Sequence, residues 1–355
     1  MLLHMDFPSG SPGVYGTTAA RLLDGMYGEA SNISLVEDPD PNVSGNVIYV
    51  GSGFLATGTL RKALPVTLAT VGAALRLYLP GLPGNDEALP NPFNVRDISN
   101  NTQVSFAIRT DGRLSAYRGY AEGGTLLGTS AAPAAIANAW QHWEFKIFSD
   151  ASTGTIEVRV DGVVVLSLTG QNTGSGLLTQ WTINSNVTGG SFSHPFYVKD
   201  LIIWDTTGAF NNNFMGSCSV KELIPDGDVA LNWALTGSVT GYGAVNEAPP
   251  DDDTKYIYAV TPAPSADLMS LTDLPVDVTS VRGLMIINRS KNTDGGDGKL
   301  QMGLVSGAST MLGTDRQITT AYTYWTDISE TDPATAAAWL PGAVNNVNLR
   351  FNRTL

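Results

Sequence analysis

The chain has 355 residues, and its 20 lysines and arginines are outnumbered by 33 aspartates and glutamates. This acidic excess leaves no basic face for a phosphate backbone or an anionic membrane, so we exclude nucleic acid and membranes as partners. Cys218 is the single cysteine, which excludes an intrachain disulfide and a cysteine-based zinc site. The 38 glycines and 19 prolines interrupt the chain often, and no helical apolar period lasts for three turns, so we expect an all-β protein.

The start of the chain, residues 1–8, has neither a basic region nor a long apolar run. We therefore expect synthesis in the cytoplasm without a signal peptide. The next part predicts four short strands, at residues 33–36, 47–50, 61–71 and 73–79. Residues 80–92 are rich in proline, which has no N–H donor for a sheet, so we predict a long loop there.

Two Asp-Gly pairs each lie between strand-like segments. Asp111-Gly112 separates residues 105–110 from 113–118, and Asp161-Gly162 separates residues 155–160 from 163–168. Aspartate and glycine tolerate the positive φ angles of a two-residue type I′ turn, so each pair predicts a tight β-hairpin. Apolar and charged residues alternate over 155–160, which is typical of a strand with one buried face.

The segment 140–146 contains two tryptophans whose faces could stack on sugar rings. Trp143 alternates with Phe145 and Ile147, however, and this pattern favours a core position for Trp143. Glu144 then faces the other way, and we interpret it as a solvated or paired charge.

A largely apolar segment, residues 197–204, predicts a central strand that is buried on both faces. Asp200 lies within it, and a carboxylate there must be hydrogen-bonded, paired or coordinated to a cation. We favour a structural hydrogen bond. The polar run 206–217 follows without periodicity, and we place a domain boundary in it, which gives domains at residues 1–215 and 216–355.

The second half predicts another β-sandwich. Its strand-like segments are residues 229–235, 255–260, 281–288, 300–305, 319–328 and 343–351. Asp332 and Pro333 suit an N-cap and a first helical position, so we predict one short helix over residues 334–340. The acidic triplet 251–253 and the loop 292–298 lack the spacing of an EF-hand, and we interpret both as solvated turns.

Several of these residues together resemble a known family. They are Asp111-Gly112-Arg113-Leu114, Trp140, Trp143-Glu144, Val160-Asp161-Gly162 and Asp200. Over roughly residues 100–205 the chain resembles the laminin-G or concanavalin A-like jelly roll found in virion proteins of tailed bacteriophages. The second half resembles, with less specific residues, the C-terminal module that accompanies this domain.

The resemblance implies a non-enzymatic virion structural protein of the tail, neck or fibre, built from two jelly-roll sandwiches in tandem. Its partners would be other virion proteins, further copies of the chain, because sheet edges need pairing, and host-surface polysaccharide. Such domains often hold Ca²⁺ at the sandwich rim, and Asp200 is the candidate metal ligand here. The candidates for sugar stacking are Tyr117, Tyr120 and Trp181, which we expect on loops.

Two alternatives remain open: a carbohydrate-binding module of an adhesin or depolymerase, and a capsid decoration protein. A glycoside-cleaving enzyme is disfavoured because the chain lacks the Glu-X-Asp-X-X-Glu triplet of concanavalin-like glycosidases and has no Gly-X-Ser-X-Gly motif. His4, His142 and His194 are far apart in the sequence, and no zinc-binding histidine motif is present.

Overall fold

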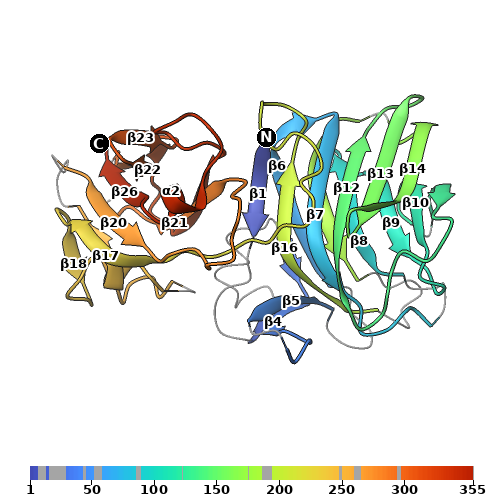
Figure 1. Cartoon of the computed structure of the whole chain (residues 1–355), viewed down its shortest axis with the longest axis horizontal. Helices are drawn as coiled ribbons and strands as arrows, with labels where there is room; N and C mark the ends of the chain where they lie inside the picture. The colour runs from blue at the N-terminus through green and yellow to red at the C-terminus, as the bar shows by residue number, and fades with distance from the viewer. Residues whose placement is uncertain are drawn as a thin grey trace. The chain divides into compact units, whose positions relative to one another are not determined.

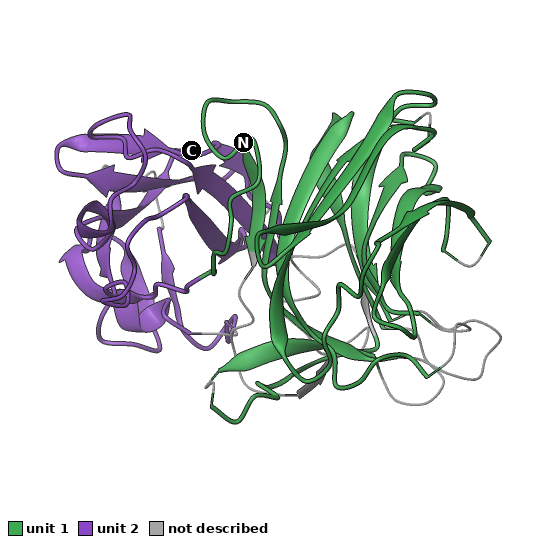
Figure 2. Ribbon diagram, turned by 45° about the vertical axis from the view of Figure 1, so that its right-hand side comes forward, with its two compact units in different colours: residues 1–220 green, residues 221–355 purple. Residues whose placement is uncertain are grey.

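A computed structural model of the chain describes most of its residues. These are residues 1–6, 13–15, 29–42, 45–51, 58–84, 89–121, 123–174, 176–185, 194–247, 250–259, 265–293 and 297–354. The chain forms two compact units, residues 1–220 and 221–355 (Figure 2). Antiparallel sheets make up nearly all of the regular structure in both, which confirms the all-β prediction. No helix in the described ranges has the length and apolar character needed to span a membrane.

Unit 1 is a sandwich of two antiparallel sheets (Figure 1). The first sheet has the order β14 (Val163–Gln171), β13 (Gly154–Val160), β12 (Trp140–Phe148), β7 (Thr70–Tyr78), β16 (Phe196–Trp204), β5 (Asn46–Val50), β4 (Ile33–Glu37) and β2 (Gly13–Tyr15), and β1 (Leu2–Asp6) also pairs with β16. The second sheet has the order β11 (Thr125–Thr129), β10 (Leu114–Arg118), β9 (Thr102–Ile108), β8 (Asn91–Asp97), β15 (Leu178–Asn184), β6 (Thr59–Leu68) and β3 (Glu29–Ser31).

Aromatic side chains from both sheets fill the core of unit 1. The ring of Phe145 on β12 lies 5.5 Å from that of Phe93 on β8 and 4.9 Å from that of Phe106 on β9, measured between centroids. Trp143, Phe145 and Ile147 are all fully buried, which confirms the predicted core face of this strand. Burying each such side chain stabilises the fold by roughly 1.5–3 kcal/mol.

The two Asp-Gly pairs form different turns. Asp161 and Gly162 have φ angles of 50° and 80°, as a type I′ turn requires, and they join β13 to β14. At the other pair only Gly112 has a positive φ, 77°. The Gly112 N–H donates to the carbonyl of Arg109 at 2.9 Å, so the loop is longer than two residues, and the tight turn predicted there was wrong.

The proline-rich stretch ends in a strand rather than running as a loop to residue 92. β8 begins at Asn91 and therefore includes Pro92, although residues 85–88 lie outside the described ranges. The ladder between β15 and β8 is irregular between Thr182 and Asn184, at the point where Pro92 lies. Since a proline can take a strand position where no ladder N–H is needed, this irregularity accommodates it.

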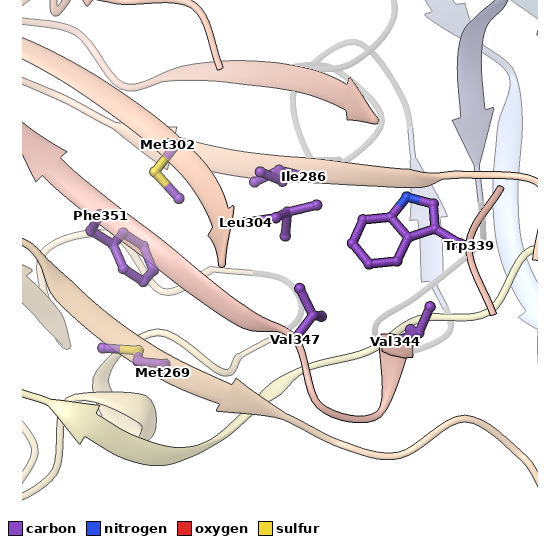
Figure 3. Close-up of a cluster of buried hydrophobic side chains, with 8 residues drawn as sticks. All are labelled: Met269, Ile286, Met302, Leu304, Trp339, Val344, Val347 and Phe351. Atoms are coloured by element: carbon purple, nitrogen blue, oxygen red, sulfur yellow. The ribbon is translucent and has the colours of Figure 1, made fainter. Parts of the chain in front are cut away.

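Unit 2 contains one larger sheet and two separate pairs of strands. The larger sheet has the order β17 (Pro225–Ala230), β20 (Asp267–Leu271), β26 (Asn348–Arg353), β22 (Lys299–Ser306) and β23 (Ser309–Leu312), with β24 (Arg316–Gln317) paired to β22. The pairs are β18 (Ala234–Thr236) with β19 (Tyr256–Tyr258), and β21 (Leu284–Ser290) with β25 (Thr323–Ser329). Figure 3 shows a cluster of buried side chains from β20, β21, β22, β26 and the segment 339–347: Met269, Ile286, Met302, Leu304, Trp339, Val344, Val347 and Phe351.

The helix predicted over residues 334–340 is absent from that segment. The carboxylate of Asp332 accepts the N–H of Ala334 at 2.9 Å, and Ala336 takes a positive φ of 56°, which ends any helix there. Trp339 lies in the core, and its indole Nε1 donates to the carbonyl of Ser329 at 3.2 Å. The helix α2 instead begins at Pro341 (Pro341–Val344), and a single 3₁₀ turn, η1 (Tyr242–Ala244), lies earlier in the unit.

Candidate functional site

Four aromatic side chains form a continuous row across the first sheet of unit 1. Trp140 on β12 lies opposite Tyr78 on β7, Tyr78 lies opposite Tyr197 on β16, and Tyr197 lies opposite Tyr49 on β5. The four strands are direct neighbours in the sheet, so the row crosses them at right angles to their length. We call these four residues the aromatic row.

The row lies on the outer face of the sheet because side chains alternate along a strand. Leu77, Val198 and Ile48 are buried in the sandwich core. The tyrosines next to them in the sequence, Tyr78, Tyr197 and Tyr49, therefore point to the outer face. All four row residues are half-buried rather than buried. Partial exposure of large aromatic rings on a sheet face is typical of a binding surface.

The rings of the row touch one another but are not coplanar. Their centroids are 5.6 Å apart for Trp140 and Tyr78, 5.8 Å for Tyr78 and Tyr197, and 5.1 Å for Tyr197 and Tyr49. The corresponding angles between ring planes are 54°, 81° and 53°. Edge and tilted contacts of this kind are favourable for aromatic pairs, so the rings hold each other in place.

Asp38 and Lys199 fix the Trp140 end of the row. The indole Nε1 of Trp140 donates to Asp38 Oδ1 at 2.9 Å, and the Lys199 ammonium donates to the other oxygen of the same carboxylate. Lys199 Nζ also lies 4.0 Å from the centre of the Trp140 ring, in a cation–π contact. The carboxylate is only 1% exposed, so this group of three is fixed within the protein.

Tyr49 and Tyr197 carry no charge at neutral pH. Burial and the neighbouring Tyr197 hydroxyl raise the pKa of Tyr49, and burial and the neighbouring Tyr78 hydroxyl raise the pKa of Tyr197. Each hydroxyl therefore stays protonated, and it can both donate and accept a hydrogen bond.

A strap, residues 205–220, covers the remaining part of the same outer face. The carboxylate of Glu144 on β12 accepts the N–H groups of Met215 and Gly216 at 2.8 and 3.1 Å. The carboxylate of Asp200 accepts the N–H of Val220 at 2.8 Å. Trp204 is fully buried beneath the strap, and its ring makes an edge contact with that of Phe214 at 6.3 Å.

The structure places the predicted stacking residues outside the row. Trp181 lies in the middle of β15 and is 1% exposed, so its predicted position on a loop was wrong. Tyr117 is on β10 of the second sheet and packs against a small buried cluster, and Tyr120 is half-buried in the turn after β10. The second tryptophan of segment 140–146, Trp143, is a core residue, whereas Trp140 belongs to the row.

Asp200 is held by protein groups. One carboxylate oxygen accepts the N–H of Val220, and the other lies 3.3 Å from Nε of Arg76, which confirms the structural hydrogen bond favoured from the sequence. Its φ of 56° marks an irregularity in the pairing of β16 with β7 between Lys199 and Ile202. Within the described ranges, no three side chains of histidine, cysteine, aspartate or glutamate form a group that could hold a metal ion.

The sequence left two interpretations of Glu144 open, a solvated charge or a paired one, and the structure excludes the solvated charge. The residue is 1% exposed, and one oxygen of its carboxylate, Oε1, accepts two backbone N–H groups of the strap. A buried carboxylate with such partners is stable because hydrogen bonds to an ionised acceptor are strong. Glu144 is therefore a paired charge, but its partners are backbone N–H groups rather than a cation.

The acidic triplet of unit 2 lies in a turn with Asp253 exposed, as we interpreted it, but two of its carboxylates are also paired with cations. The carboxylate of Asp252 forms two hydrogen bonds to the guanidinium of Arg289, at 2.6 and 3.0 Å. Asp253 pairs with Lys291 and accepts the hydroxyl of Tyr322 at 3.0 Å. Burial and this hydrogen bond raise the pKa of Tyr322 to about 12, although Lys291 acts in the opposite direction. The triplet therefore connects this turn to the two-stranded sheet of β21 and β25.

No protein-family model matches the chain, and no curated protein matches it. Solved structures with a similar arrangement include a sialidase, with a TM-score of 0.37 and 10% identity over 58% of this chain, which spans 18% of that protein. Another is domain 4 of AbnA, a GH43 extracellular arabinanase from Geobacillus stearothermophilus in complex with arabinotriose, with a TM-score of 0.34 and 14% identity over 55% of this chain and 82% of that domain. A third is the carbohydrate recognition domain of Emp47p, with a TM-score of 0.35 and 11% identity over 51% of this chain and 92% of that domain.

Proposed function

We propose that unit 1 is a non-enzymatic carbohydrate-binding sandwich and that the aromatic row is its binding surface. The observation that carries this proposal is the direct cross-strand pairing of Trp140, Tyr78, Tyr197 and Tyr49 on one outer sheet face. Four adjacent rings that leave the core and stay partly exposed offer apolar faces in a fixed arrangement.

The chemistry of the row suits sugars. A pyranose ring has an apolar face of C–H groups that can pack on an aromatic ring, and hydroxyls at its edge that need hydrogen-bond partners. Tyrosine supplies both an apolar ring and a polar tip, at a low cost in side-chain entropy. The protonated hydroxyls of Tyr49 and Tyr197 can pair with sugar hydroxyls in either direction.

The carboxylates nearest the row support binding rather than catalysis. Glycoside hydrolysis uses two carboxyl groups that flank the bond to be cleaved. Asp38 is engaged by Trp140 and Lys199, and Asp200 is engaged by Val220 and Arg76. Neither carboxylate is presented toward a ligand on the row.

Affinity electrophoresis in gels that contain soluble polysaccharides tests the proposal. The intact chain is expected to be retarded in at least one of these gels. Tyr78→Ala and Tyr197→Ala should each weaken the binding by about tenfold or more, which corresponds to about 1.4 kcal/mol. Tyr117→Ala is the matched control, because it removes the same side chain from the second sheet and should leave the retardation unchanged. Equal loss in all three variants, or none in the row variants, would contradict the proposal.

We propose further that the chain acts as a virion appendage protein that binds host-surface polysaccharide and assembles with other copies and virion proteins. The resemblance of residues 100–205 supports this, and so does the free edge strand β14. None of the nine residues of β14 is charged, and Val163 and Val164 are 66% and 49% exposed. Long uncharged edge strands favour pairing with another chain.

Immunogold electron microscopy of purified particles tests the virion proposal. Label at one particle feature is the expected result, and label confined to the cell surface or the soluble fraction would favour the adhesin or depolymerase alternative. Analytical ultracentrifugation of the full chain tests self-association through β14. Val164→Lys should shift the protein toward the monomer, and an unchanged distribution would exclude this edge as the contact.

A further inference from the structure

We infer that the aromatic row binds a single, uncharged polysaccharide chain that runs across the strands and twists along its length. This inference rests on the proposed carbohydrate binding and adds the class of ligand. Three features of the row carry it: its direction relative to the strands, the tilt between its rings, and the pairing of the cations beside it.

The direction of the row sets the direction of the ligand. Its four members occupy directly opposed positions on β12, β7, β16 and β5, so a chain that contacts all of them must cross the strands. Neighbouring strands are about 4.8 Å apart, and three such steps give a row of about 14 Å. One ring is therefore available for each of about three or four successive sugars.

The tilt between the rings selects for a twisted chain. A flat crystalline surface presents sugar faces in one plane and needs coplanar aromatic rings to stack on. The planes in this row differ by 54°, 81° and 53° from one ring to the next. Successive sugars can follow these rings only if each is rotated relative to the one before it, as in a single soluble chain.

The charges beside the row favour a neutral ligand. Lys199 lies two residues from Tyr197, and its ammonium is held by the carboxylate of Asp38. Arg76 lies two residues from Tyr78, and its guanidinium is 3.3 Å from the carboxylate of Asp200. Both cations are thus paired within the protein, and the chain as a whole has a net charge of −13, which repels a polyanion.

The test compares three kinds of probe with the full chain. Soluble neutral polysaccharides (xylan, mixed-linkage β-glucan, galactomannan, arabinan and dextran) and the acidic polygalacturonate are used in affinity gels, and microcrystalline cellulose is used in a depletion assay. We expect retardation by at least one neutral polymer, with none by polygalacturonate and no depletion by cellulose. Retardation by polygalacturonate, or depletion by cellulose that Tyr197→Ala abolishes, would overturn the inference while leaving carbohydrate binding intact. The absence of any binding would overturn the proposed function itself, and the inference with it.

Oligosaccharides cut from the polymer that binds provide a second measurement. Isothermal titration should show the affinity rising by about tenfold or more from two sugar units to about four, and little beyond, because the row is then filled. Affinity that is already maximal with a disaccharide would show that only one or two rings are used and would overturn the proposed course of the chain. Tyr49→Ala, at the far end of the row from Trp140, should remove the last part of this gain.

Discussion

The outer face of the first sheet has two parts, formed by the same strands: one is covered by the strap, and the other is the partly exposed aromatic row. On β16, Tyr197 lies in the aromatic row and is half-buried, whereas Trp204 at the other end of the strand is fully buried beneath the strap. In the covered part, buried carboxylates hold a segment of backbone over the sheet. In the row, the carboxylate of Asp38 instead holds the edge of an aromatic ring. The covered part contributes to stability, and the row is left available to a ligand.

The largest expected effect separates the two aromatic residues of β16. Trp204→Ala should lower the free energy of unfolding by about 3–5 kcal/mol, because it leaves a large cavity under the strap. Tyr197→Ala, the matched change in the row, should lower it by about 1 kcal/mol or less, since its side chain lies on the outer face and is already partly exposed. Chemical denaturation of the full chain measures both. Similar losses in the two variants would show that the row is part of the core.

A pH titration of stability probes the border between the two parts, where His142 lies on β12 with Nε2 3.8 Å from Sγ of Cys218 in the strap. Burial and the guanidinium of Arg76 lower the pKa of His142 to about 4, although Asp161 acts in the opposite direction. The unfolded chain takes up this proton near pH 6.5 and the folded chain only near pH 4. Stability should therefore be lost as the pH falls through that window, by about 3 kcal/mol.

His142→Gln is the control for this titration, because it removes the titrating group from the same position. The variant should lose less stability than the parent protein between pH 6.5 and 4. A residual slope is expected, since burial and Lys62 also lower the pKa of His4. Identical slopes in the two proteins would mean that His142 titrates normally when folded.

Removal of the Glu144 carboxylate, which binds the strap, should lower the free energy of unfolding by less than the Trp204 substitution does. Glu144→Ala leaves the N–H groups of Met215 and Gly216 without their acceptor and should cost about 2 kcal/mol of stability. Glu144→Gln retains one acceptor oxygen and should cost less. Limited proteolysis of residues 205–220 should become faster in the alanine variant, while polysaccharide binding should not change. A loss of binding would show that the two parts of the face are coupled.

Metal removal should have the smallest effect. The row holds its rings through contacts with one another and through Asp38 and Lys199, so EDTA should leave binding by the row unchanged. Binding that EDTA abolishes and Ca²⁺ restores would point instead to a rim site of the kind for which Asp200 was the candidate. Asp200→Asn would then test whether Asp200 coordinates the Ca²⁺ ion, with Asp38→Asn as the control variant.

Local patterns in the sequence predicted the parts of the fold that depend on near neighbours. Alternation placed Trp143, Phe145 and Ile147 in the core, and the second Asp-Gly pair predicted a type I′ hairpin correctly. The strands β15 and β20 were missed because few apolar residues alternate in them and polar residues flank them. Trp181 was placed on a loop for the same reason.

The aromatic row could not be predicted from such patterns. Its members come from four strands that are far apart in the sequence, and their alignment depends on the register of three separate pairings. Each tyrosine does lie between apolar residues of a strand-like segment, as in Val47-Ile48-Tyr49-Val50, but this pattern alone does not show which face of the sheet the ring is on. Only the sheet order shows that these positions are adjacent.

The sheet binds the strap through backbone groups, and this affects how the sequence of the strap can change. Glu144 and Asp200 accept main-chain N–H groups at residues 215, 216 and 220, and these groups are the same for every amino acid but proline. At residue 220 this contact should therefore tolerate any amino acid except proline, whereas Met215 is buried and Gly216 has a φ of 72°, so these two positions are restricted for other reasons. Related chains can be expected to keep the two carboxylates while the segment above them diverges, which fits its composition of small polar residues without a recognisable motif.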